Sequence, residues 1–350
     1  MKNLYSMRSF LTIIALLLVI AGNVKAQDVH FSQFYASPLT LNPALTGKVN
    51  GNYRIAGIYR SQWGGMLEGR KPTYGTPGIS FDLPIFVGKR KVDAVGLGAS
   101  FVNDFTNGGR YNVVKAMLSA SYIKSLGKSS KHQLSIGVQG GIQQSKTGSF
   151  RFEDQFIGGI YNEGNTSVDA GYNNQSAIVP DFQAGLFYNG AVSQRVTIYG
   201  GFSLFHLFTP SYNITQSASG NLPRRYVGHA GLEWDLTKNR KWTLYPGVIY
   251  MNQATADELN FGTNIGYHFK VDPEGRNTSI FLGAWYRYQD AVIPMVGFEF
   301  KGFRAGFSYD ATTSDLTNGN SQGAYELSLI YVGRFSSITD KKTFLFCPRF

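Results

Sequence analysis

The sequence predicts an all-β protein: a transmembrane antiparallel β-barrel of about 14 strands with an N-terminal plug or rim segment. Three observations predict it. From about residue 52 onward apolar side chains recur at every second position, the connections between these segments alternate between short and long, and aromatic residues, which make up 15% of the chain, gather near segment ends. Only 16% of residues are charged, and a disordered chain would show the opposite composition.

The first 26 residues have the three parts of a secretory signal peptide. Lys2 and Arg8 form a basic region, Phe10 through Ile20 supply an apolar stretch, and Val24-Lys25-Ala26 places small residues before a cleavage point. We expect cleavage before Gln27, because the apolar run is shorter than the roughly 17–25 residues that span a bilayer as a helix. An N-terminal membrane anchor is the alternative.

The alternation from residue 52 onward predicts strands with two different faces. Near residues 132–145, for example, Leu134, Ile136 and Val138 share one face, while glutamine and serine occupy the other. A soluble β-sandwich would alternate too, so the pattern leaves open which solvent the apolar face meets. The inward positions are expected to be polar, namely Gln133, Gln139, Gln143, Gln183, Asn260 and Asn264. Strands are expected near 52–60, 76–84, 93–103, 111–124, 132–145, 179–189, 196–208, 225–236, 241–251, 258–270, 277–288, 291–300, 303–311 and 323–335.

The connections and the aromatic residues favour a membrane barrel over a sandwich. Single-chain outer-membrane barrels have an even number of strands, short periplasmic turns and longer outer loops, and the expected connections alternate in this way. Aromatic pairs near strand ends, such as Phe101 with Phe105, Phe205 with Phe208 and Trp285 with Tyr286, are typical of the girdles at the two lipid–water interfaces. Residues 51–335 are therefore assigned to an outer-membrane barrel, and residues 336–350 to a C-terminal periplasmic tail.

The charges separate by sign between the two kinds of connection. Acidic residues prevail in the long connections, such as 146–178, whereas the short turns are basic. We interpret the basic turns as a periplasmic rim that contacts anionic partners or lipid headgroups, with ordinary solvated turn charges as the alternative. Because the basic residues are scattered over turns, nucleic acid is not an expected partner. The rim consists of Lys89, Arg90, Lys91, Lys128, Lys131, Lys238, Arg240 and Lys241.

The sequence offers little sign of catalysis or of a cofactor. The histidines at positions 30, 132, 206, 229 and 268 have no metal-ligand spacing, and Cys347 is the single cysteine. We expect no enzyme activity, no metal and no cofactor. A serine hydrolase stays open, because a triad can assemble across strands, and His206 and His229 lie on adjacent expected strands.

Residues 27–50 precede the first strand and have neither helical nor strand periodicity. The segment is aromatic and contains Pro38 and Pro43, which favour turns. An apolar segment of this kind would not stay free in water. We expect it either to enter the barrel lumen as a plug or to pack along the periplasmic rim.

This segment resembles the opening of the PorP/SprF family of type IX secretion system outer-membrane proteins of Bacteroidetes. The resemblance also includes Asn52-Tyr53-Arg54 and Tyr59-Arg60-Ser61-Gln62-Trp63, and the C-terminal motif Cys347, Pro348, Arg349 and Phe350. The matching positions of the segment are Gln27, Asp28, Phe31, Ser32, Gln33, Phe34, Tyr35, Pro38, Leu39, Asn42, Pro43, Ala44 and Gly47.

The resemblance implies a non-enzymatic outer-membrane component of the type IX secretion and gliding machinery. Such a protein would anchor or assist the export and surface display of a large secreted adhesin, and would contact periplasmic ring or peptidoglycan-binding lipoproteins as well as membrane lipids. The main alternative is a fatty-acid-transporter-like barrel for small hydrophobic molecules, which would need a continuous apolar path through the lumen. A plain diffusion pore is the third possibility, and a blocked lumen would exclude it.

Overall fold

The computed structural model describes residues 28–62, 74–87, 93–106, 110–127, 131–157, 160–162, 164–215, 218–272, 275–314 and 323–334. The expected signal peptide (1–26) and the expected C-terminal tail (336–350) lie outside these ranges, and with the tail the motif Cys347, Pro348, Arg349 and Phe350.

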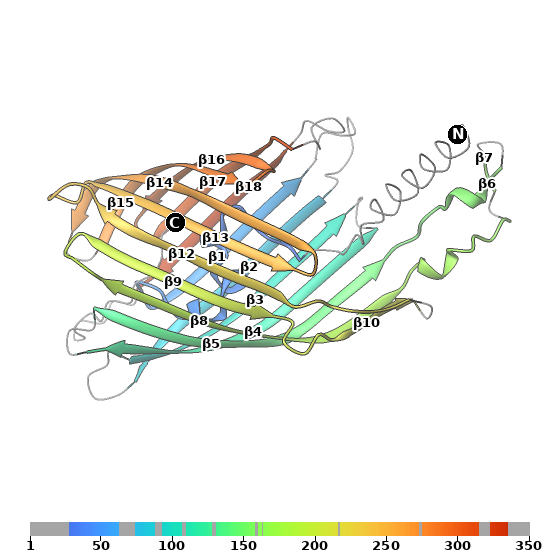
Figure 1. The fold of residues 1–350 in the computed structure, drawn as a ribbon, viewed down its shortest axis with the longest axis horizontal. Coiled ribbons are helices and arrows are strands. Elements are labelled where there is room, and N and C mark those ends of the chain that lie inside the picture. The colour runs from blue at the N-terminus through green and yellow to red at the C-terminus, as the bar shows by residue number, and fades with distance from the viewer. Residues whose placement is uncertain are drawn as a thin grey trace, which may run out of the picture.

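The described residues form a closed antiparallel barrel of fourteen strands, which confirms the predicted fold class and strand number (Figure 1). Strand β1 pairs with β18 from Tyr53 opposite Gly333 to Gln62 opposite Ala324, and this pairing closes the sheet. Each expected strand is present, with ends that differ by a few residues. The barrel strands are β1 (Tyr53–Gln62), β2 (Tyr74–Val87), β3 (Asp93–Thr106), β4 (Tyr111–Leu126), β5 (His132–Thr147), β8 (Ser176–Ala191), β9 (Val196–Phe205), β12 (Arg225–Asp235), β13 (Trp242–Gln253), β14 (Ala256–Asp272), β15 (Gly275–Arg287), β16 (Ala291–Phe300), β17 (Phe303–Thr312) and β18 (Ala324–Gly333).

The two ends of the barrel differ in the length of their connections. We call the end with turns such as 192–195, 236–241 and 301–302 the short-turn end, and the opposite one the long-loop end. The connection from β5 to β8 contains η4 (Glu153–Gln155), β6 (Phe156–Ile157), β7 (Ile160–Tyr161) and η5 (Ala170–Tyr172), and the connection from β9 to β12 contains the hairpin β10 (Ser211–Thr215) and β11 (Ala218–Asn221). Figure 1 shows β6 and β7 projecting far beyond the barrel wall.

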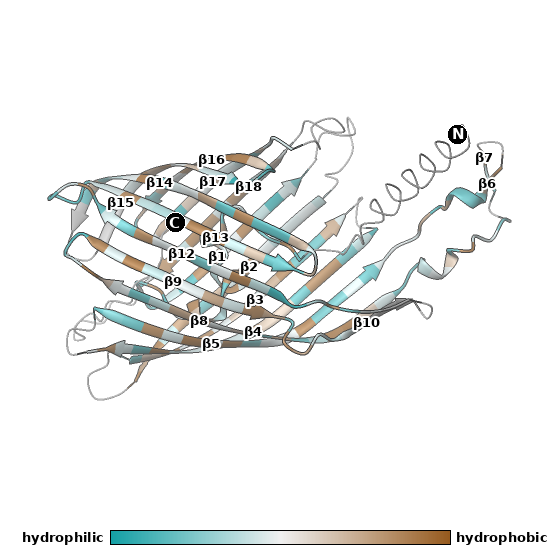
Figure 2. Cartoon of the chain, viewed as in Figure 1, coloured by the Kyte–Doolittle hydropathy of each residue, from teal (hydrophilic) through white to brown (hydrophobic). Residues whose placement is uncertain are grey.

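The outside of the barrel is apolar, and many of the inward-facing side chains are polar. Leu118 is 72% exposed and Ile136, Val138 and Ile142 are more than half exposed, as expected of side chains that face lipid. The alternation is visible along the strands in Figure 2. The glutamines and asparagines that were expected to face inward are all buried, with at most 5% of each side chain exposed: Gln133, Gln139, Gln143, Gln183, Asn260 and Asn264.

Two aromatic residues that we expected in the interfacial girdles face the lumen instead. Phe205 and Trp285 are each only 2% exposed. Trp285 shares the inward face of β15 with Phe281, and its ring meets the ring of Phe34 edge-on at 5.2 Å. Nearness to a strand end therefore did not decide the environment of these rings; their position in the two-residue alternation did. In the part of the chain that the structure describes, no helix has the length and hydropathy needed to cross a membrane.

Candidate functional site: the lumen segment and its anchors

Residues 28–49, here called the lumen segment, lie inside the barrel. Of the two expected positions, the segment therefore takes the one in the lumen and not the one along the rim. The segment folds into η1 (Phe34–Ala36), α2 (Pro38–Leu41) and η2 (Pro43–Leu45). Pro38 and Pro43 are the first residues of α2 and η2, where proline costs no helical hydrogen bond. The side chain of Asn42 accepts a hydrogen bond from the backbone N–H of Ala44 at 2.9 Å and so caps η2.

Glycines on two wall strands allow the backbone of the lumen segment to approach closely. A Cβ atom on Gly96 of β3 would overlap the carbonyl group of Thr46, and one on Gly137 of β5 would overlap the backbone of Pro43. The lumen segment has its own glycine at the same contact: Gly47 has a φ of +72°, in the left-handed region, and its Cβ position faces Gly96. These glycines therefore shape the wall around the segment.

At the short-turn end a buried ion pair holds the segment. Arg54 donates to both carboxylate oxygens of Asp82, at 2.8 and 2.7 Å, and the backbone N–H of Gly47 donates to the same carboxylate at 2.7 Å. The guanidinium of Arg54 also donates to the carbonyl of Leu45 at 3.2 Å. Nearby, the ammonium of Lys48 donates to Gln133 and Asn189. The strands thus supply a charged clamp for residues 45–48, and water is excluded from it because Asp82 and Lys48 are fully buried.

In the middle of the lumen the contacts are neutral hydrogen bonds and apolar packing. The amide of Asn42 donates to the carbonyl of Leu186 at 2.9 Å and lies 3.3 Å from Nε2 of His229. The hydroxyl of Ser203 donates to the carbonyl of Leu41 at 2.7 Å. Two apolar clusters surround these bonds; one contains Phe31, Tyr35, Ala36, Tyr245, Phe281 and Trp285, and the other contains Leu41, Ala44, Leu45, Phe187, Tyr199 and Phe205.

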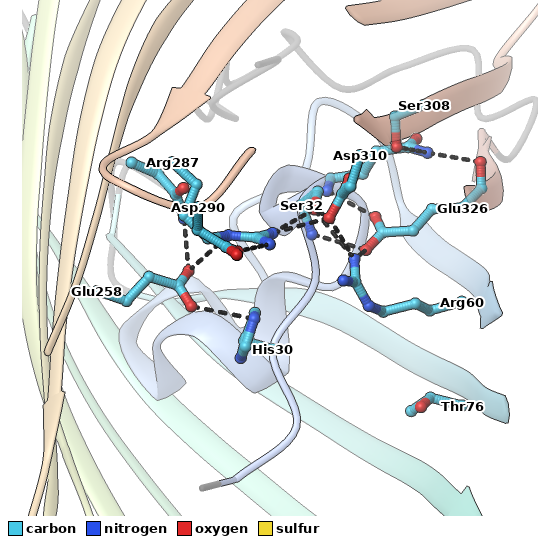
Figure 3. Close-up of polar contacts among 12 residues, drawn as sticks. His30, Ser32, Arg60, Thr76, Glu258, Arg287, Asp290, Ser308, Asp310 and Glu326 are labelled. Carbon is cyan, nitrogen blue, oxygen red and sulfur yellow. Dashed lines mark hydrogen bonds and ion pairs between the residues drawn. The ribbon is translucent and has the colours of Figure 1, made fainter. Parts of the chain in front are cut away.

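Toward the long-loop end, a buried network of arginines and carboxylates surrounds Ser32 (Figure 3). The hydroxyl of Ser32 donates to Oδ2 of Asp310 at 2.8 Å, and its backbone N–H donates to Glu326 at 2.7 Å. Arg60 pairs with both carboxylates, at 3.0 Å to Asp310 and 2.6 Å to Glu326, and Arg287 pairs with Asp310 at 2.9 Å. The four charged residues come from β1, β15, β17 and β18, so the network connects the segment to four strands at once.

Gln33 extends the same anchor, and its side chain is satisfied at both ends. The backbone N–H of Gln33 donates to Glu326 at 2.8 Å, and its amide nitrogen donates to the hydroxyl of Ser308 at 3.1 Å. The amide oxygen accepts from the hydroxyl of Ser328 at 2.6 Å. A buried glutamine with this many partners specifies one register of the segment, because a shift by one residue would leave these groups unpaired.

Asp28, the first described residue, is held by a second cluster at the long-loop end. Its carboxylate lies 2.8 Å from the ammonium of Lys115 and 2.5 Å from Nε2 of His206, whose Nδ1 faces Asp181 at 2.9 Å. Burial alone would raise the pKa of Asp28, but the charges of Lys115, His206 and Arg225 hold that pKa well below its ordinary value. Burial lowers the pKa of His206, and the two carboxylates outweigh it and raise the pKa above 6.5. His206 has a φ of +58°, which ends β9 earlier than expected.

His30, His229 and His268 also serve as polar contacts of the lumen. His30 faces Glu258 at 3.0 Å, and His268 lies 2.6 Å from the hydroxyl of Ser279 and 3.0 Å from that of Thr243. His268 and Ser279 are fully buried, so this serine–histidine pair is not open to a substrate in this structure. Among the described residues, no group of three or more histidine, cysteine or acidic side chains has the arrangement of a metal site.

A small cavity flanks the lumen segment at Phe31 and Leu39. It lies against Val102 and Met117, with Gln139 contributing a polar side. The volume open to the centre of a water-sized sphere is about 40 Å³. At about 10–15 Å³ for each water molecule, this cavity accommodates only a few waters.

Residues 23–331 match the protein family described as "Type IX secretion system membrane protein PorP/SprF". The chain belongs to the PorP/SprF family. Among solved structures, the toluene transporter TbuX of Ralstonia pickettii is similar, with a TM-score of 0.51 and 12% identity over 86% of this chain and 94% of that one. The toluene transporter TodX of Pseudomonas putida has a TM-score of 0.46 and 11% identity over 87% and 93%. A comparison with curated protein sequences gave no significant match.

These comparisons confirm the family that the sequence suggested, and they place the protein among membrane barrels. PorP/SprF proteins are membrane components of type IX secretion. At 12% identity the likeness to TbuX shows a shared fold and nothing about substrates.

The structure brings together the part of the family motif that it describes between Asp28 and Gly47. Its residues Phe31, Ser32, Gln33, Phe34 and Tyr35, then Pro38, Asn42, Pro43 and Ala44, and finally Gly47 lie in the lumen, while Gln27 falls outside the described residues. A role of these residues in partner binding stays a prediction. Of the basic rim, Lys131, Lys238, Arg240 and Lys241 lie at the short-turn end, and Lys89, Arg90, Lys91 and Lys128 fall outside the described residues.

Sequence reasoning missed most of the anchors that the barrel wall of the PorP/SprF protein supplies. Asp82, Arg287 and Glu326 were not recognised as partners of the segment, although a signal was present. Each is a charged residue within a strand, and a charge facing lipid near the bilayer midplane costs about 2–4 kcal/mol for lysine or arginine. Charged strand residues therefore had to point inward, toward whatever fills the lumen.

Proposed function

We propose that this protein is a non-enzymatic outer-membrane component of the type IX secretion and gliding machinery that anchors or assists the export and surface display of a large adhesin. In this proposal the barrel is a scaffold and does not conduct the client. The observation that carries the proposal is the lumen segment, which occupies the lumen and is tied to the wall at the Arg54–Asp82 pair and at the network around Ser32.

The anchors make the lumen a poor route for a polypeptide. Withdrawing the segment would break the contacts of Ser32 and Gln33 with Glu326 and of Gly47 with Asp82. Each of these contacts is a hydrogen bond to a buried carboxylate, which contributes about 1.5–3 kcal/mol, so losing them together is strongly unfavourable without an external driver. The same argument disfavours a plain diffusion pore.

The proposed orientation follows the connection lengths. Outer-membrane barrels place short turns in the periplasm and long loops outside. The short-turn end, with Lys131, Lys238 and Lys241, would then contact periplasmic ring or peptidoglycan-binding lipoproteins and the headgroups of lipids. The β5–β8 connection would face the secreted adhesin. Residues 1–26 as a cleaved signal peptide and 336–350 as a periplasmic tail belong to the same proposal.

Uptake of small hydrophobic molecules is the alternative, and the shared fold with TbuX is what recommends it. That function needs an apolar path, whereas the inward positions here include Gln139, Gln143 and Gln183, and the cavity beside Phe31 accommodates only a few waters. An uptake assay with toluene or a long-chain fatty acid in cells with and without the protein distinguishes the two. Uptake that depends on the protein would favour the transporter.

Affinity purification of the detergent-solubilised protein tests the main proposal. Secretion-system components and a large surface protein should co-elute. The charge-reversal variant Lys238→Glu with Lys241→Glu should lose periplasmic components and keep the surface protein, because it alters only the short-turn end. If neither class co-elutes with the wild-type protein, and surface display continues in a deletion strain, the proposal is wrong.

A loop exchange tests the assignment of the client side. Replacing residues 146–178 by the corresponding connection of a paralogue should change which adhesin is displayed on the cell surface. An exchange of the β9–β12 connection, 206–224, serves as the control. Unchanged client choice in the first exchange would contradict the assignment.

A further inference from the structure

The β5–β8 connection is a folded projection with internal hydrogen bonds. Its strands β6 and β7 pair at Phe156 with Tyr161 and at Ile157 with Ile160. The amide of Gln155 donates to the carbonyl of Asn165 at 3.0 Å, and the backbone N–H of Val168 donates to the carboxylate of Asp154 at 3.0 Å. These bonds hold residues 153–168 together as one unit at a distance from the barrel (Figure 1).

The end of this projection exposes large apolar side chains. Ile157 is 60% exposed, Ile160 is 74% exposed and Val168 is 92% exposed, and beside them Phe156 is 42% exposed. We call these four residues the hairpin tip. Apolar side chains grouped on a soluble surface and surrounded by polar residues mark sites where another molecule binds. The rings of Phe156 and Tyr161 pack against each other across the hairpin, with their centroids 5.6 Å apart, whereas Ile157 and Ile160 are opposite each other at the next position and stay exposed.

Acidic residues border the hairpin tip. Glu153 and Asp154 lie three and two positions before Phe156, and Asp169 directly follows Val168; all three are exposed. The described cation of this region, Arg151, lies over the ring of Tyr161, with 4.5 Å between its guanidinium carbon and the ring centroid. The tip is therefore an apolar surface with a negative border. Its complement is an apolar surface with a positive border.

From this geometry we infer that the hairpin tip is a docking site for a protein segment with apolar side chains flanked by lysine or arginine, carried by the secreted client. The inference rests on the proposed function, because it names the contact through which the client is held. The tip stands beyond the long-loop end, where a displayed protein would emerge. Apolar burial would supply affinity, and the acidic border would select the segment and raise its association rate.

The acidic border also argues against a membrane surface as the occupant. A bilayer surface rich in anionic groups repels Glu153, Asp154 and Asp169, and apolar residues that insert into membranes are accompanied by lysine and arginine instead. The negative border fits a basic protein segment and does not fit anionic lipid. Lipid binding is nevertheless an outcome that the experiment can detect.

Photo-crosslinking in cells identifies the occupant. A photoreactive phenylalanine analogue is placed at position 160 and, as the matched control, at position 192, since Val192 is 57% exposed in a turn at the short-turn end. Position 160 should give a crosslinked product that contains a secreted surface protein, and mass spectrometry should place the crosslink in an apolar stretch next to basic residues. Position 192 should not give this product.

Substitutions test whether the contact matters. Ile157→Ser with Ile160→Ser should lower the amount of client that co-purifies by about tenfold or more, because both apolar side chains lose their burial. Val192→Ser should leave it unchanged. In the variant Glu153→Gln with Asp169→Asn, the amount of client that co-purifies should fall less steeply with rising salt concentration than in the wild type. The reason is that fewer charges remain to be screened.

Each result separates the inference from the proposed function. If secretion components and a client co-purify but position 160 crosslinks only to lipid, or gives no product, the hairpin tip is not the docking site and the proposed function survives. If wild-type protein yields neither components nor client, the proposed function fails first. Heat-modified mobility on gels shows that each variant retains a folded barrel, so a misfolded variant is recognised and replaced by Ile160→Ser alone.

Discussion

Neutralising Asp310 should loosen the outer part of the lumen segment while leaving the barrel intact. Oδ2 of Asp310 accepts three hydrogen bonds: from the hydroxyl of Ser32 at 2.8 Å, from Arg60 at 3.0 Å and from Arg287 at 2.9 Å. Its other oxygen, Oδ1, is buried without a hydrogen-bond partner. In the variant Asp310→Asn, the amide nitrogen can take the position of Oδ1 and the remaining oxygen can keep all three bonds. The substitution therefore removes the charge and keeps the shape.

The magnitude follows from the bond of Ser32, because Arg60 and Arg287 belong to the barrel wall and their bonds to Asp310 are not broken when the segment opens. A hydrogen bond to a charged group contributes about 1.5–3 kcal/mol and a neutral one about 0.5–1.5 kcal/mol, so the substitution lowers the free energy of opening the segment by about 1 kcal/mol. Since 1.36 kcal/mol corresponds to a factor of ten, local opening should become about fivefold more frequent.

Hydrogen–deuterium exchange measures this opening directly. The backbone N–H groups of Ser32 and Gln33 donate to Glu326, and they exchange only when the segment leaves its site. A peptide covering 28–37 should exchange about fivefold faster in Asp310→Asn. Asp257→Asn is the matched control, because Asp257 contacts Tyr250 and Asn252 at the exposed rim and not the segment.

Peptides of the wall strands β4 and β5 should exchange as in the wild type, which shows that the barrel is folded. An acceleration of less than about threefold at 28–37, with an intact wall, would refute the reasoning that the charge of Asp310 holds the segment.

Three further predictions follow from other contacts. Gly137→Ala should destabilise the folded protein by roughly 1–3 kcal/mol, because its methyl group overlaps the backbone of Pro43. Gly228→Ala, which has open space at its Cβ, should not destabilise it. Heat-modified mobility on gels compares the stability of the two variants. Because the pKa of His206 is raised in the folded state, its stabilising charge is present below about pH 6.5 and is lost as the pH rises through the higher folded pKa. Thermal stability should therefore fall over that pH interval in the wild type, and fall less in His206→Asn. Equal slopes of thermal stability against pH in the two proteins would contradict the role of the cluster around Asp28. Leu118→Lys should weaken folding into lipid vesicles by about 2–4 kcal/mol, because this 72% exposed side chain faces lipid, whereas Val168→Lys on the projection should have no effect; the vesicle folding yield in urea measures both.

The barrel itself could be predicted from the sequence, because its signal is local. Alternation with a period of two is a property of each strand, and a strand that faces lipid on one side must repeat it. The strand positions, the polar inward face at Gln133 and Gln183, and the family motif from Phe31 to Gly47 were therefore visible before any pairing was known. Whether that motif lies in the lumen or along the rim could not be predicted from the sequence, because either position would bury its aromatic side chains.

Only the tertiary structure decided which wall residues meet the lumen segment. Arg60 and Asp310 are 250 positions apart in sequence, and Ser32 and Glu326 are 294 apart, so no local pattern relates them. Closing β1 on β18 brings these side chains to one level of the lumen. The same closure set Gly96 and Gly137 against the backbone of the segment. The periodicity of single strands determined the barrel, and long-range pairing determined what the barrel holds, because a buried charge is stable only where its partner lies within hydrogen-bond distance.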